Sequence, residues 1–158
     1  MLDSVLIEET EKNIDITEDA TFYETYSKAA SVIIEYRAAV IHVYNSRNRD
    51  IIEKYLHNTT EYLVGLFVKK YSKDHKLTED DREYITCFYS YSIVGIVSRW
   101  IGEGMPPYDK DLIKRFSESF DATIDTMINL CEANNLVIKT DKTCKVFDFG
   151  TKYMLCRG

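Results

Sequence analysis

The sequence predicts an all-α protein, an antiparallel bundle of helices, and three observations support this. Apolar residues recur at spacings of three and four along five segments, which is the period of an amphipathic helix. With six Gly and two Pro in 158 residues, long stretches contain no helix breaker. Almost nothing before residue 135 alternates with the two-residue period of a strand. The length suits one domain with a buried core.

The first three segments form the N-terminal half of the predicted bundle. Residues 2–14 form a short helix that is acidic away from its few apolar positions. Residues 20–44 form a long helix with Thr17 or Asp19 as its cap, and a break near Arg37 would divide it in two. Residues 48–71 continue the same apolar period.

The fourth segment is apolar on almost every side. Thr78 and Asp81 resemble a capping box that starts a helix, and nearly every residue from Tyr84 to Ile101 is apolar. The apolar run is too short, and too often interrupted by Ser and Arg, to be a membrane span. A helix without a polar face needs cover all round. We therefore expect it to pack against its own bundle and against a second copy; the alternative is a central helix of a single protomer.

The sequence predicts a last helix over residues 109–133. Together with the fourth segment, this helix would form the interface between two copies. Two helices from each of two chains make a closed two-fold interface of four helices. Gly95 would let two backbones approach closely there. The predicted interface residues are Ser92, Gly95, Ile96, Arg99, Phe116, Phe120, Ile124 and Met127.

Residues 135–158 are predicted to be a tail outside the helical domain of residues 1–134. Leu136–Thr140 and Thr143–Phe147 flank Asp141-Lys142, an arrangement that predicts a small β-hairpin.

Tyrosines on the inward-leaning parts of three helices suggest a small-molecule pocket. A buried Tyr offers apolar area and a hydroxyl that needs a partner, and pockets between helices combine these two properties. The alternative is that these tyrosines are core residues whose hydroxyls reach the surface. The predicted ligand-binding residues are Tyr36, Val40, Tyr62, Leu66, Phe88 and Tyr91.

Motifs of catalysis, cofactor binding and metal binding are not found. The sequence has no phosphate loop, no HExxH and no GxSxG, so we expect neither an enzyme nor a cofactor nor a metal site. The formal charge of −6 argues against binding nucleic acid through bulk electrostatics. The first residues do not resemble a signal peptide and the four Cys form no CxxC pair, which favours a cytoplasmic protein with reduced thiols.

A short pattern then suggests a family. It comprises Gly95, the pair Arg99-Trp100, the pair Gly104-Met105, and the acids Asp109 and Asp111. This pattern resembles the C-terminal regulatory region of TetR-type transcriptional regulators, most closely the subgroup that controls dihydroxyacetone kinase operons.

The resemblance implies a domain that forms homodimers and binds a small-molecule effector. Operator DNA would be contacted only through an N-terminal helix-turn-helix lobe, for which this sequence has no room, so the chain resembles a regulator that begins just after that lobe. The competing interpretation is a free-standing helical interaction module, homodimeric or heterodimeric, without a pocket.

Overall fold

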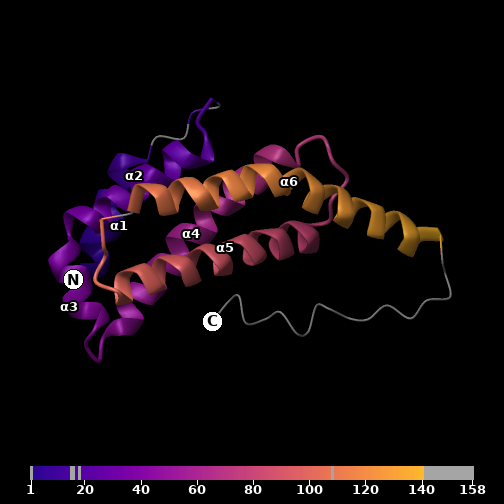
Figure 1. Ribbon diagram of the computed structural model, residues 1–158. Helices are drawn as coiled ribbons and strands as arrows, with labels where there is room; N and C mark the ends of the chain where they lie inside the picture. Colours follow the sequence, from indigo (N-terminus) through magenta and orange to yellow (C-terminus); the bar gives the residue numbers. More distant parts are fainter. Residues whose placement is uncertain (1, 15–16, 18, 108, 141–158) are drawn as a thin grey trace.

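The computed structural model describes residues 2–14, 17, 19–107 and 109–140, and all regular structure among them is helical. The helices are α1 (Leu2–Asn13), α2 (Phe22–Glu35), α3 (Arg37–Tyr44), α4 (Arg49–Tyr71), α5 (Glu79–Gly102) and α6 (Asp109–Thr140). Figure 1 shows α5 and α6 side by side and running in opposite directions. The all-α prediction is confirmed, and so is the break near Arg37.

Capping boxes start two of the helices, α2 and α5. At α5 the predicted box is confirmed, because Thr78 Oγ1 accepts from the backbone N–H of Asp81 at 3.1 Å. At α2 the cap is Thr21, not Thr17 or Asp19: Thr21 Oγ1 accepts from the N–H of Glu24, whose carboxylate accepts from the N–H of Thr21, both at 3.2 Å. The pair satisfies two amide groups reciprocally, which a cap at Thr17 or Asp19 could not do without Glu three residues later.

α6 is longer than the sequence pattern predicts. It continues through residues 136–140, which were expected to form the first arm of a hairpin. The prediction of a strand there is wrong: the apolar run suits either structure, and with no Gly or Pro to end the helix before it, α6 continues through it. The second expected arm, residues 143–147, lies outside the described residues.

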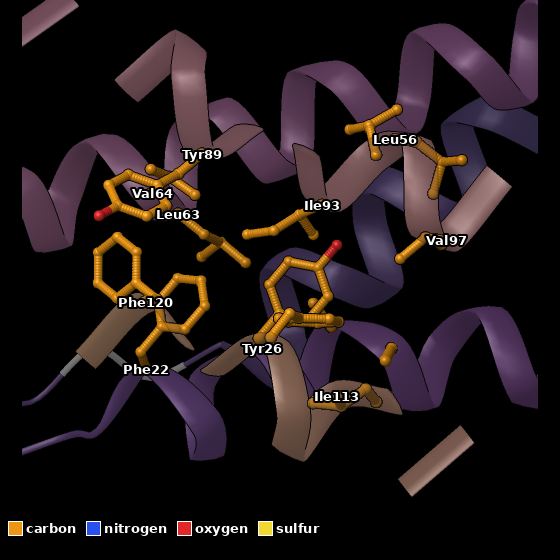
Figure 2. Packing of buried hydrophobic residues seen from close by; sticks show 14 of the residues in the cluster. Phe22, Tyr26, Leu56, Leu63, Val64, Tyr89, Ile93, Val97, Ile113 and Phe120 are labelled. Atoms are coloured by element: carbon orange, nitrogen blue, oxygen red, sulfur yellow. The ribbon is translucent and has the colours of Figure 1, made fainter. Parts of the chain in front are cut away.

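The core lies around α4, which packs against all five other helices. At its centre, the ring of Phe22 stacks on Phe120 of α6 with centroids 4.4 Å apart (Figure 2). The Phe22 ring also meets Phe67 of α4 edge-on, with centroids 5.3 Å apart. Tyr26 contacts Phe116 edge-on at 4.8 Å. Aromatic contacts of this kind join α2, α4 and α6 into one cluster.

None of the described helices is both long enough and apolar enough to pass through a membrane.

Candidate functional site

α5 buries one half of its surface and exposes the other. The buried stripe comprises Ile85, Tyr89, Ile93, Val97, Trp100 and Ile101, which face the core. The opposite stripe comprises Tyr84, Phe88, Tyr91, Ser92, Gly95, Ile96 and Arg99, all exposed. From Tyr84 to Ser98 the chain has no charged residue, so the outer surface of this part of α5 is uncharged and carries aromatic, aliphatic and small side chains.

α6 continues this surface on its flank beside α5. The hydroxyls of Thr123 and Tyr89 share a hydrogen bond of 2.7 Å, which places that flank directly next to α5. Leu130 is 57% exposed two turns further along, and Met127 between them is half-buried. We call the exposed stripe of α5 together with Ser119, Thr123, Met127 and Leu130 of α6 the contact face.

The contact face contains only part of the predicted interface. Ser92, Gly95, Ile96 and Arg99 lie on it, and Met127 lies at its edge.

The other three predicted residues, Phe116, Phe120 and Ile124, are buried within the protomer, with 6%, 1% and 1% of their surface exposed. They pack against the core cluster and offer no area to a second copy unless the protomer rearranges. On α6, neighbouring stripes of side chains are offset by only one position in the sequence. The spacing of the apolar residues alone therefore could not show which stripe faces the core of the protomer.

Gly95 occupies a position that the protomer does not require to be Gly. A Cβ atom built there would meet nothing within 4 Å. In the interior of a helix, Gly costs about 1 kcal/mol relative to Ala, so its presence is unfavourable for the isolated chain. A close approach by a surface outside the protomer would explain it.

The predicted ligand-binding residues are not brought together around one cavity. Val40 is fully buried, and Tyr36 and Leu66 are half-buried. Phe88 and Tyr91 belong to the contact face, where the ring of Tyr91 lies 4.9 Å from that of His57. Tyr62 is 61% exposed and lines a separate groove.

This groove runs between α1 and α4 and has a volume of about 560 Å³. Its lining comprises Ile7, Thr10, Glu11, Ile14, Asn58, Thr59 and Tyr62. Sequence reasoning missed six of these seven residues, because the weak apolar pattern of residues 2–14 gives no sign of which α1 positions face α4. We call this feature the α1–α4 groove.

Beneath the groove, two pairs of buried hydroxyls tie the N-terminal helices to α4. Thr10 of α1 and Tyr55 share a hydrogen bond of 2.6 Å, and Tyr26 of α2 and Thr60 share one of 3.0 Å. Burial raises the pKa of both tyrosines, so their phenols stay protonated at neutral pH. The space between them is too small for a ligand, at about 10 Å³, which is room for about one water molecule.

Three of the residues that suggested the family, Trp100, Gly104 and Met105, help to build the turn between α5 and α6. Gly104 and Met105 have positive φ angles of 84° and 54°, which reverse the chain direction. The indole N–H of Trp100 donates to the carbonyl of Pro106 at 3.0 Å, and Arg37 donates to the carbonyl of Gly104 at 2.6 Å. These contacts explain Trp100, Gly104 and Met105 as parts of the fold.

No cluster of three or more His, Cys, Asp or Glu that could hold a metal ion occurs in the described part of the chain.

Comparison with known families defines the class of protein. A family model described as a transcriptional regulator C-terminal region matches residues 20–122, well over half of the chain and the range from α2 into α6. The class is therefore the regulatory region of a transcriptional regulator. More particularly, the chain belongs to the TetR family. No curated protein and no solved structure matches it.

Regions of this family typically dimerise and bind small-molecule effectors, and they are generally not enzymes.

Proposed function

We propose that this chain is a dimerising, effector-sensing region in which two copies meet through the contact face. The observation that carries the proposal is the uncharged outer surface of α5 from Tyr84 to Ser98, continued on α6. Phe88, Tyr91 and Ile96 are each 40–50% exposed there. A group of large exposed apolar side chains of this kind marks an interaction site in a folded protein.

A second copy is the occupant that best fits this surface. The face has no charged side chain over its central part, so two identical faces can meet without placing like charges together. At its end, Arg99 forms an ion pair of 2.9 Å with Glu103, the residue that directly follows α5 in the same chain. A self-complementary patch is what a two-fold axis requires.

The sensing role follows from how α1 is connected. α1 is tied to α4 by the bond between Thr10 and Tyr55, and α4 packs along α5. A helix-turn-helix lobe joined ahead of α1 would therefore be connected through α4 to the dimer. An effector that binds one arrangement of these helices more tightly would bias the distance between the two lobes on operator DNA.

The proposal includes the finer predictions from the sequence. The pattern around Gly95, Trp100 and Gly104 supports a relationship to regulators of dihydroxyacetone kinase operons, and membership of the TetR family supports a cytoplasmic location.

The test replaces an apolar residue of the contact face by an acid. Ile96→Glu places two carboxylates at the two-fold seam, and their desolvation should separate the copies. Light scattering after size exclusion should give about twice the 18.4 kDa chain mass for the wild type and the single chain mass for the variant.

The matched control is Ile34→Glu, which changes an equally exposed Ile on α2, outside the contact face. It should leave the dimer intact. A monomeric wild type would favour the alternative of a helical module that pairs with some other protein. A dimer that Ile96→Glu leaves unchanged would contradict the contact face as the place where the two copies meet.

A further inference from the structure

The α1–α4 groove provides the chemistry for one class of ligand. We infer that it binds a small organic cation with an apolar body, an alkylammonium or arylammonium compound. The inference names a class of ligand for the proposed sensing role, and its meaning for regulation rests on that role. Binding of the ligand itself can be measured on this chain alone.

The walls of the groove are suited to an apolar body. Ile7 of α1 is 44% exposed and Tyr62 of α4 is 61% exposed, although both are large apolar side chains. Ile14 completes the apolar wall at the end of α1. The volume of about 560 Å³ lies within the range of small-molecule sites. A ligand in the groove would remove this apolar surface from water.

The charge of the groove is negative. Glu11 is the one charged residue in its lining, and no base in the described part of the chain lies within ion-pair distance of it. Lys12, the base of α1, is already held by Glu8 at 2.9 Å and by Glu9 at 3.0 Å. Lys54 lies one turn before Asn58 on α4 but is not part of the lining.

The end of α1 strengthens the preference for a cation. Thr10, Glu11 and Ile14 lie in and just beyond the last turn of α1, where the helix dipole places partial negative charge. The face of the Tyr62 ring is a further attraction for an ammonium group. The carboxylate, the helix end and the ring all favour positive charge, and the side chains of Asn58 and Thr59 can accept its hydrogen bonds.

The ligand would also touch the bond that ties α1 to α4. Thr10 lines the groove, and its hydroxyl is shared with Tyr55. A compound seated between Glu11 and Tyr62 therefore contacts both helices at the point where they are joined. This position allows a bound cation to change how α1 is held.

The experiment uses three probes of one shape and different charge: n-hexylammonium, n-hexanoate and n-hexanol at pH 7. Amide resonances of the isotope-labelled chain are followed by NMR during each titration. We expect n-hexylammonium to shift the amides of Ile7, Thr10, Asn58 and Thr59, with affinity at least about tenfold above that of n-hexanoate.

Single substitutions inside and outside the groove distinguish binding in the groove from a general attraction between the cation and the acidic chain. Glu11→Gln should weaken n-hexylammonium binding about tenfold, whereas Glu8→Gln removes one charge from α1 outside the groove and should change it less than twofold. Tyr62→Ala should weaken binding, and Tyr23→Ala, a similarly exposed Tyr on α2, should not.

The inference is overturned if those four amides do not shift, if n-hexanoate binds as well as n-hexylammonium, or if Glu11→Gln and Glu8→Gln behave alike. Such a failure beside an intact dimer would remove the cation site and leave the dimer proposal in place.

Discussion

Two buried serine hydroxyls are the least satisfied polar groups in the described core. Ser90 on α5 and Ser117 on α6 are 2% and 1% exposed, and neither Oγ has a hydrogen-bond partner. A buried hydroxyl without a partner costs about 1–3 kcal/mol. Ser90→Ala removes that cost and also favours the helix, so we expect it to raise the free energy of unfolding by about 1 kcal/mol in urea denaturation.

Ser31→Ala is the matched control for this change. Ser31 is exposed on α2, outside the contact face, and its hydroxyl donates to the carbonyl of Lys28 at 2.6 Å, so its replacement relieves no burial cost. The stability of this variant should differ from the wild type by a few tenths of a kcal/mol, about the difference in helix propensity. Equal gains in both variants would show that the buried hydroxyl of Ser90 has a partner in solution.

For single residues, the sequence predicts interactions between residues close together in the chain better than contacts between residues far apart in it. The box of Thr78 and Asp81 depends on residues three apart and could be predicted directly. The bond between Thr10 and Tyr55 joins residues 45 apart, and no local pattern contains that pairing. This is why the α1–α4 groove could not be predicted.

Among the elements, α6 is held to the rest of the bundle by a polar clasp near its C-terminal end. Glu132 accepts a hydrogen bond from His75 Nδ1 at 2.9 Å and another from the backbone N–H of Lys76 at 3.1 Å. Asn135 donates to Asp81 at 2.6 Å, at the first turn of α5. The last turns of α6 extend past this point (Figure 1).

The clasp predicts a pH dependence of stability. The hydrogen bond from His75 holds the pKa of Glu132 below its usual value, with the Lys76 amide adding to the effect. A carboxyl whose pKa is lower in the folded state contributes stability that is present above its unfolded pKa of about 4.3 and lost as pH falls through its folded pKa. Glu132→Gln should therefore lower the melting temperature at pH 7, and its deficit should shrink at pH 3.

Glu118→Gln serves as the comparison, because Glu118 is an exposed acid of α6 whose contact with Lys114 is loose, at 3.8 Å. Its melting temperature should follow the wild type at both pH values. A Glu132→Gln deficit that stays constant from pH 7 to pH 3 would show that the carboxylate does not stabilise the clasp.

The sequence predicts the presence of most helices, but it predicts less well where each helix ends. Strong apolar periods and breakers predicted the ranges of α4 and α5 and the division between α2 and α3. The end of α6 could not be predicted because residues 136–138 are apolar and suit a strand as well as a helix.

For the whole molecule, the main result is the division of α5 between the core and the contact face. The sequence predicted that both sides of α5 must be buried against other surfaces. It could not show that the stripe of Phe116, Phe120 and Ile124 covers the inside, because burial within the protomer and burial between copies require the same apolar side chains.

The most direct test of the contact face detects protons of one copy beside methyl groups of the other. A mixed dimer is prepared from one copy with labelled Ile and Met methyls and one unlabelled, and intermolecular NOEs are recorded. The proposed dimer predicts NOEs to the methyls of Ile96 and Met127 and none to Ile34. Intermolecular NOEs at Ile34 with none at Ile96 would contradict it.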